Sequence, residues 1–278
     1  SQIEKSQKKV EENHFGVRKH LLEYDDVMNS QRKVIYTRRR HALMGERIGI
    51  DILNMIYDGV SNLVEQLVAT EDVETFRMEM LRWFSINIKV EDGWKRKKQD
   101  ELIESLYQEV VNVFKRKVEK IAAVAYPVIK NVYENQGSQY KNIIVPITDG
   151  KLMYNIPVNL EEAYNTQGKE IVKAFQKQVL LHTIDEAWKE HLRELDELRG
   201  SVQNASYAQK DPLLIYKLES FGLFKKLIEN VNYKAITILM RAQIPVKEGD
   251  AVQEAAPERR TDRTKYQEQK SDIMRAGE

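Results

Sequence analysis

The sequence has no cysteine and little proline or glycine, and each shortage excludes something. Without Cys, the 278-residue chain has no disulfide, no thiolate metal ligand and no cysteine nucleophile, which suits a reducing compartment. It has 6 Pro and 12 Gly, with no Pro before Pro127, so the first half permits long helices. No apolar run approaches the roughly 20 residues of a membrane-spanning helix, and residues 1–5 do not resemble a signal peptide. We therefore expect no integral membrane segment.

The charge and size of the chain bound its class further. Its 44 basic residues nearly balance 43 acidic ones, which argues against a dedicated nucleic-acid binder. A hydrophobic fraction of 42% is enough to bury a core, and the length allows one large domain or two to three small ones. The chain begins without Met and ends in a polar stretch, so we expect it to be a piece of a longer protein.

Helical periodicity predicts one very long helix from about Lys5 to His41. Its apolar residues recur every seven positions in two interleaved columns. These columns are Val10, Val17 and Tyr24, and His14, Leu21, Met28, Ile35 and Ala42. At 1.5 Å per residue such a helix is roughly 55 Å long. Further apolar residues lie off both columns, so more than one face must be covered, and the helix is predicted to be a strut that contacts several bodies.

The next region, residues 45–168, is predicted to form a small helical domain. A helical pattern covers residues 46–90 and breaks near Asp92, and a third helix keeps one apolar stripe from Leu102 to Val124 until Pro127 is expected to interrupt it. Two β-prone runs, 142–147 and 151–157, flank an Asp-Gly pair that favours a β-hairpin. Asn159 and Glu162 resemble a capping pair for a short helix closed by Gly168.

Two more apolar-striped helices, 169–199 and 213–242, are joined by the polar segment 200–212. Long helices with a short connection are expected to fold back as an antiparallel helical hairpin, with Tyr207 near its tip. An aromatic residue in a polar loop either folds back on its own hairpin or contacts a polypeptide through its ring and hydroxyl. Residues 243–278 form a charged tail that we expect to be disordered.

Catalytic and ligand-binding patterns are largely missing from the sequence. It contains neither a GxxxxGK[ST] phosphate loop nor a GxGxxG motif after a strand, so no nucleotide site is predicted. His182 and His191, with Asp185, Glu186, Glu190 and Glu194 nearby, form the one cluster that resembles a metal site. Nine helical residues separate the two histidines by about 13 Å, which is too far to share an ion.

Three charged or aromatic groups each allow a structural and a functional interpretation. Glu23, Asp25 and Asp26 could act as paired carboxylates, but a helix face with salt bridges to Arg18, Lys19, Arg32 and Lys33 explains them better. The basic run Arg38 to His41 suits a helix C-terminus, with acidic lipid or nucleic acid as the alternative. We expect Trp83, Trp94 and Trp188 to fill core positions.

Three long stretches carry a family resemblance. They are QKKVEENHFGVRKHLLEYDDVMNSQRKVIY (Gln7 to Tyr36), LLHTIDEAWKEHLRELDELR (Leu180 to Arg199) and YAQKDPLLIYKLESFGLF (Tyr207 to Phe224). In order and spacing they resemble the C-terminal half of the SecA family, the ATP-driven motors of bacterial preprotein translocation. The resemblance covers roughly residues 1–240.

The resemblance implies a mainly α fold and a role for each part. Residues 1–44 would be the long helix of the helical scaffold domain, and 45–168 the helical wing domain with a β-hairpin insertion near 142–157. Residues 169–242 would be the second scaffold part with the two-helix finger, and 200–212 its tip loop. In the family the finger reaches the SecYEG channel, so Tyr207, Gln209 and Lys210 are expected to contact the moving preprotein.

The chain departs from the family pattern in three ways. The family's motor domains with their ATP and Mg sites precede the matching segment and are absent here, so we expect no cofactor, metal or catalytic residue in this chain and no hydrolysis by it alone. The wing hairpin is missing from many relatives. Many members also end in a Cys-rich zinc-binding tail, which a chain without Cys cannot form.

The resemblance therefore predicts a segment of a translocase that couples ATP hydrolysis elsewhere to movement of unfolded preproteins through SecYEG. It implies as partners the motor domains, the preprotein, SecYEG, acidic lipid and a second copy, but no nucleic acid, at the cytoplasmic face of the cell membrane. The alternative is a purely structural helical scaffold or coiled-coil adaptor without substrate contact. A hydrolase built on Asp25 is a remote third interpretation.

Overall fold

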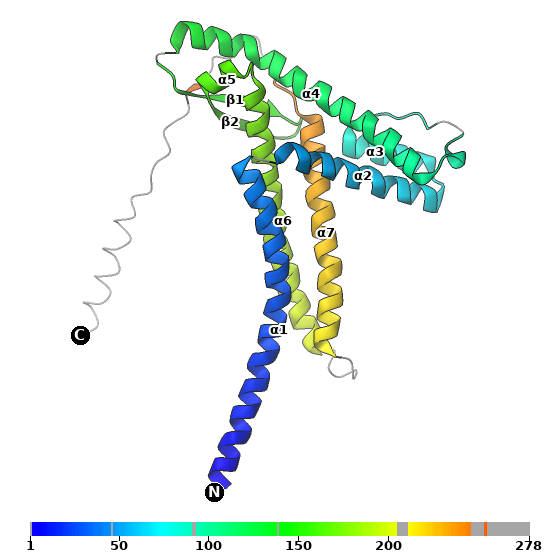
Figure 1. The fold of residues 1–278 in the computed structure, drawn as a ribbon, viewed down its shortest axis with the longest axis vertical. Coiled ribbons are helices and arrows are strands. Elements are labelled where there is room, and N and C mark those ends of the chain that lie inside the picture. The colour runs from blue at the N-terminus through cyan, green and yellow to red at the C-terminus, as the bar shows by residue number, and fades with distance from the viewer. Residues whose placement is uncertain are drawn as a thin grey trace, which may run out of the picture.

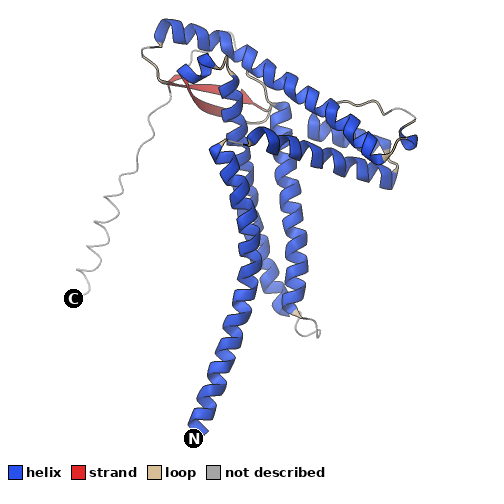
Figure 2. Cartoon of the chain, in the orientation of Figure 1, coloured by secondary structure: helices blue, strands red, loops and turns tan. Residues whose placement is uncertain are grey.

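The computed structural model describes residues 2–45, 47–90, 93–137, 139–204, 211–245 and 253–254. It confirms a mainly α fold with a small antiparallel hairpin (Figure 2). The helices are α1 Gln2–Met44, α2 Ile48–Thr70, α3 Val73–Phe84, a 3-10 turn η1 Trp94–Arg96, α4 Gln99–Gln136, α5 Leu160–Asn165, α6 Lys169–Asn204 and α7 Pro212–Arg241. The strands are β1 Asn142–Thr148, β2 Met153–Asn159 and β3 Gln253–Glu254.

Helix α1 is the unbroken strut that the sequence predicted. Its 43 residues extend about 65 Å and end at Gly45, whose φ of 75° is left-handed and whose N–H donates to the His41 carbonyl at 3.0 Å. Figure 1 shows the C-terminal half of α1 beside α6 and α7, and its N-terminal half projecting past the end of their hairpin. The strut is therefore supported along only part of its length.

The single helical segment expected over 46–90 is two helices, α2 and α3. Helix α2 ends where Glu71 takes a left-handed φ of 56°. Asp72 then caps α3, since its carboxylate accepts hydrogen bonds from the Thr75 N–H at 3.0 Å and the Thr75 hydroxyl at 2.6 Å. The hydrophobic period alone does not show this break, because both helices bury their apolar faces in the same core.

The prediction that Pro127 interrupts the third helix was wrong, because Pro127 lies inside α4. A proline in a helix interior costs about 3 kcal/mol, since it removes one backbone hydrogen bond and crowds the preceding turn. Beyond it, Ile129 and Val132 are buried and Tyr133 stacks on Tyr164 with ring centroids 4.2 Å apart. Each buried aliphatic side chain contributes roughly 1.5–3 kcal/mol, so packing after the proline offsets its cost.

The β-hairpin forms as predicted, with β1 and β2 antiparallel and Ile147 opposite Tyr154. Asn159 caps α5 by accepting from the Glu162 N–H at 3.1 Å, which confirms the capping pair. The sheet order is β2-β1-β3, and Gln243 exchanges two backbone hydrogen bonds with Thr148. Of the tail, whose disorder was predicted, residues 246–252 and 255–278 lie outside the described part of the chain.

Gly168 closes α5 at a point where only glycine fits. Its φ is 82°, and a Cβ there would lie 2.8 Å from the Ala122 carbonyl oxygen of α4. We expect Gly168→Ala to lower the free energy of unfolding by about 2 kcal/mol, because left-handed strain and displacement of α4 act together. Urea unfolding measures the loss.

Gly150 is the matched control for this prediction. It has a similar φ of 88°, but a Cβ added there would have no atom within 4 Å, so Gly150→Ala carries only the backbone strain of about 1 kcal/mol. Equal losses in the two variants would contradict a close approach of α4 at Gly168.

Three clusters of buried side chains make up the described core. The largest lies under α2, α3, α4, the sheet and the adjoining ends of α6 and α7. A second joins α1 to the middle of α6 and α7, and a third lies nearer the tip of their hairpin. In Figure 1 helices α2, α3 and α4 cross the end of this three-helix shaft. Helices α2 to α4, here called the wing, thus lie across the end of the shaft that α1, α6 and α7 form (Figure 1).

Candidate functional site

The antiparallel pair α6 and α7 is the predicted helical hairpin, but its loop is shorter than expected. Helix α6 continues through Gly200 to Asn204, and α7 begins at Pro212. Asp211 caps α7 by accepting from the Leu213 N–H at 3.0 Å, with Pro212 in the first turn, where its missing N–H costs nothing. The predicted contact residues Tyr207, Gln209 and Lys210 lie outside the described residues.

An apolar cluster fixes the strut to the middle of the hairpin. Ile35 of α1 is 1% exposed and meets side chains from both hairpin helices. Those side chains are Ile184, Ala187, Trp188, Leu227 and Val231. Because one residue of α1 fills a space between α6 and α7, separating the strut from the hairpin would open a cavity.

Buried hydrogen bonds beside this cluster link α1, α6 and α7. The Gln31 Nε2 of α1 donates to the Ser220 carbonyl oxygen of α7 at 3.1 Å. Its Oε1 lies 2.8 Å from Nε2 of His191 on α6, so His191 carries its proton on Nε2. Gln31 and His191 are 8% and 1% exposed, and burial lowers the pKa of His191 to about 4.

We expect Gln31→Leu to cost about 2 kcal/mol of unfolding free energy, because it leaves the His191 N–H buried without an acceptor. His191→Leu likewise leaves the Gln31 Oε1 buried without a hydrogen-bond donor. The double variant removes both partners, so its cost is expected to be smaller than the sum of the two. Chemical denaturation of the four proteins gives the coupling energy.

Additive losses in that cycle would show that the Gln31–His191 contact contributes nothing. Gln7→Leu is the control, since Gln7 lies on the same helix and is exposed. We expect it to change stability by less than about 0.5 kcal/mol.

A second set of contacts ties the strut to the hairpin nearer its tip. Tyr24 of α1 meets Tyr216 of α7 edge to face, with ring centroids 4.8 Å apart. The Arg199 guanidinium of α6 lies 5.5 Å from the centroid of the Tyr24 ring and 3.7 Å from the Asp25 carboxylate. Arg199 lies five residues before the end of α6 and Tyr216 four residues after the start of α7, so the strut is held close to the tip.

The acidic cluster in α1 is a partly exposed, partly ion-paired face. Asp25 pairs with Arg199 of α6, while the Arg32 guanidinium donates to the Asn29 side chain at 3.3 Å. The structural interpretation therefore holds for Asp25, but its partner comes from another helix because α6 packs along this face of α1. That partner was beyond the reach of the sequence pattern.

The basic run at the end of α1 likewise makes contacts within the chain. The Arg39 guanidinium donates to both carboxylate oxygens of Asp185 on α6, at 2.7 and 3.1 Å. The His41 ring lies 3.9 Å from the Asp51 carboxylate of α2. Two of the four residues in this run thus connect the strut to its neighbours.

The three tryptophans that were expected in the core are packing residues. Trp94 and Trp188 are each 9% exposed, and Trp83 packs half-buried against the main core. No group of three or more potential metal ligands occurs among the described residues. None of the described helices is long and apolar enough to cross a membrane.

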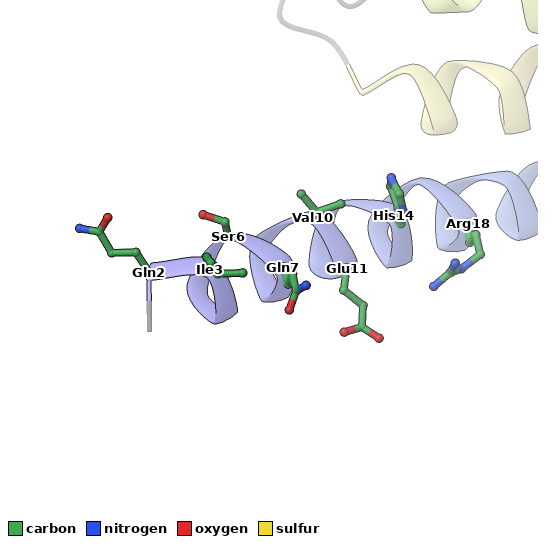
Figure 3. Close-up of a pocket in the computed structure, with 8 residues that line it drawn as sticks. All are labelled: Gln2, Ile3, Ser6, Gln7, Val10, Glu11, His14 and Arg18. Carbon is green, nitrogen blue, oxygen red and sulfur yellow. The ribbon is translucent and has the colours of Figure 1, made fainter.

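The N-terminal half of α1 exposes several apolar side chains. A shallow hollow there is lined by residues of α1 alone, so it has no opposite wall and is not a binding cavity (Figure 3). Among the side chains that the structure describes in this half, the large exposed apolar ones are Ile3, Val10, Phe15, Leu21 and Leu22. Such a surface is typical of a helix that another body covers.

Comparison with known proteins establishes the family. The family described as "SecA Wing and Scaffold domain" matches residues 1–243. The chain belongs to the SecA family. A Protein translocase subunit SecA of Bacteroides thetaiotaomicron is 57% identical over 276 residues, which cover 96% of this chain and 25% of that protein. The one of Parabacteroides distasonis is 53% identical over 304 residues, covering 98% and 27%.

A more divergent Protein translocase subunit SecA, from Christiangramia forsetii, is 47% identical over 254 residues, covering 91% of this chain and 23% of that protein. The SecA-family chain thus spans about a quarter of the length of these curated relatives. Its mainly α fold is consistent with the family description.

Sequence reasoning missed Gln31, and a signal for it was present. Gln31 continues the column of Val10, Val17 and Tyr24 at the same seven-residue spacing. A polar residue in an apolar column indicates a buried polar contact. Its partners, Ser220 and His191, lie 189 and 160 residues away, and no local pattern identifies them.

Proposed function

We propose that this chain is the wing and scaffold part of a protein translocase, and that it transmits movement to an unfolded preprotein. The observation that supports this most is the attachment of one long helix to both arms of a helical hairpin. Ile35, Gln31 and Tyr24 make that attachment at three levels along α1. A rotation of the strut would carry the hairpin with it, because packed helices move as rigid bodies.

In this proposal the tip residues Tyr207, Gln209 and Lys210 contact the preprotein at the SecYEG channel. A tyrosine ring offers apolar area and one hydrogen bond to almost any sequence, which suits a client of variable sequence. The sequence carries no phosphate loop, so ATP and Mg²⁺ would be bound by motor domains that contact α1. The assembly would work at the cytoplasmic face of the cell membrane, where acidic lipid and a second copy are further proposed partners.

Replacing Tyr207 tests the contact with the preprotein. For this test, the present chain can replace the matching quarter of the Bacteroides thetaiotaomicron relative. We expect Tyr207→Ala to lower preprotein translocation about tenfold, since removing an aromatic anchor costs about 1–2 kcal/mol. Basal ATP hydrolysis is expected to persist, because ATP would be bound by other domains and not by the tip. Tyr207→Phe keeps the ring and should retain most of the activity.

Unchanged translocation by Tyr207→Ala would remove the assignment of the tip. The alternative, a structural adaptor, differs in a second measurement on the chain itself. A photoreactive residue at position 207 should crosslink to an unfolded polypeptide, whereas one at the exposed wing residue Tyr57 should not. Equal crosslinking from both positions, or none from either, would favour the adaptor.

A further inference from the structure

A groove of about 650 Å³ runs between α4 and the start of α6 in the wing. Figure 1 shows α4 passing across this end of α6, at the opposite end of the hairpin from the tip. Residues 115–127 of α4 form one wall and residues 167–176 the other.

The spacing of the lining residues matches a groove for a helix. Along α4 the lining positions are 115, 118, 119, 122, 123, 126 and 127, and along α6 they are 169, 172, 173 and 176. Both sets follow the i, i+3, i+4, i+7 pattern with which one helix face meets another. The α4 wall rises about 18 Å, which corresponds to roughly three turns of a third helix.

The floor of the groove is apolar, and most of its side chains are short. Ala123 and Pro127 are exposed, and Val118 and Tyr126 are partly exposed beside buried Ala122. The close approach of Gly168 to the Ala122 carbonyl fixes α4 against the turn before α6. This close backbone contact fixes the position of one wall relative to the other.

The rim of the groove is basic. Lys115, Lys169 and Lys173 line it and are exposed, against one carboxylate, Glu119. No ion pair of these three lysines occurs within the described parts of the chain. An apolar floor with a cationic rim complements a helix that is apolar on one face and acidic at its borders.

We propose that this groove binds an acidic amphipathic helix of a partner protein. The site lies at the wing, whereas the hairpin tip is roughly 40 Å away along α6, counted from Gln176 to Asn204. The proposal is therefore independent of the contact between tip and preprotein. It assigns to the wing a docking role for a helical segment of another protein, at a place formed in part by the turn between α5 and α6.

The probe for this site is a synthetic peptide of about 14 residues, with leucines at i, i+3, i+4 and i+7 spacing and glutamates elsewhere. Fluorescence anisotropy with the full chain should give a dissociation constant on the order of 10 µM. A matched peptide with lysine in place of each glutamate should bind at least about tenfold more weakly. Equal binding of the two peptides, or no binding of the acidic one, would overturn the proposal.

Two exposed residues of α4 supply a matched pair of variants. Ala123→Glu places a carboxylate in the floor, whereas Val124→Glu places one next to it on α4 outside the lining. We expect Ala123→Glu to weaken the acidic peptide about tenfold and Val124→Glu to leave it unchanged. Lys115→Glu with Lys169→Glu should reverse the preference in favour of the lysine peptide. Equal effects at positions 123 and 124 would contradict docking in the groove.

Other occupants give distinct results and would overturn the commitment to a partner protein. If a second copy filled the groove, sedimentation would show a dimer that Ala123→Glu dissociates. If residues 246–278 filled it, their deletion would raise the affinity for the peptide. If anionic lipid filled it, phosphatidylglycerol vesicles would compete with the peptide and phosphatidylcholine vesicles would not. A monomer that is insensitive to both the deletion and the vesicles supports the proposal.

Discussion

Ile35→Ala is expected to lower the free energy of unfolding by about 4 kcal/mol and to loosen the strut from the hairpin. Ile35 is 1% exposed, and its side chain fills the space between Ile184 of α6 and Leu227 of α7. Truncating a buried isoleucine removes transfer free energy and leaves a cavity, which together cost about 2–5 kcal/mol. The measurement is urea unfolding, combined with hydrogen exchange of the α1 amides.

Val34 supplies the control for this experiment. It precedes Ile35 on the same helix but is 45% exposed, so Val34→Ala should change stability by less than about 0.5 kcal/mol. Exchange of the α1 amides around residue 35 should become faster in Ile35→Ala alone. A stable Ile35→Ala variant with protected α1 amides would show that this cluster does not hold the strut.

The second large effect is a loss of stability in acid, caused by His191. Burial lowers its pKa from 6.5 to about 4 in the folded state, because a charged imidazolium would lose its hydration at this buried position. Protonation would place the new hydrogen on Nδ1, which has no hydrogen-bond partner and lies 3.8 Å from a Glu194 oxygen. Between these two pKa values the unfolded chain therefore binds more protons than the folded one.

Stability should consequently rise with pH across this window, by about 3 kcal/mol in total. His191→Phe should remove that contribution, so its pH profile between 4 and 6.5 is expected to be flatter than that of the unaltered chain. His182→Gln is the control, because His182 is exposed and lies nine residues earlier on the same helix. A His191→Phe profile as steep as the His182→Gln profile would contradict a neutral, buried His191.

Helical periodicity predicted most of the fold because each long helix buries a regular apolar stripe. The column that ends in Ile35 and Ala42 illustrates this, since both residues are about 1% exposed. Turn chemistry predicted the hairpin at Asp149 and Gly150 and the end of α5 at Gly168 equally well. In these places the local sequence and the final packing favour the same structure.

The errors arose where packing outweighed a local preference. Pro127 disfavours a helix, but Ile129 and Val132 are buried beyond it and keep α4 continuous. Gly200 was expected to begin the tip loop, yet it lies within α6, and the better signal was the Asp211–Pro212 pair that starts α7. Glycine permits a turn but does not require one.

The candidate site was predicted only in part. The hairpin follows from the order and length of the apolar stripes, whereas its attachment to α1 was implied only by the family resemblance. The contacts that make the attachment stiff, such as Gln31 with His191 and Arg199 with Asp25, join residues far apart in the sequence. A period along one helix shows which face is buried but not which helix covers it.

The central claim is that the strut and the hairpin form one rigid lever, and a distance measurement tests it most directly. Because the chain has no native Cys, Lys33→Cys on α1 and Lys226→Cys on α7 can carry two spin labels without background. Both positions are exposed, so labelling should leave the packing intact. We predict a single narrow distance distribution by double electron-electron resonance, broadened by Ile35→Ala. A broad or two-peaked distribution in the otherwise unaltered chain would contradict the lever.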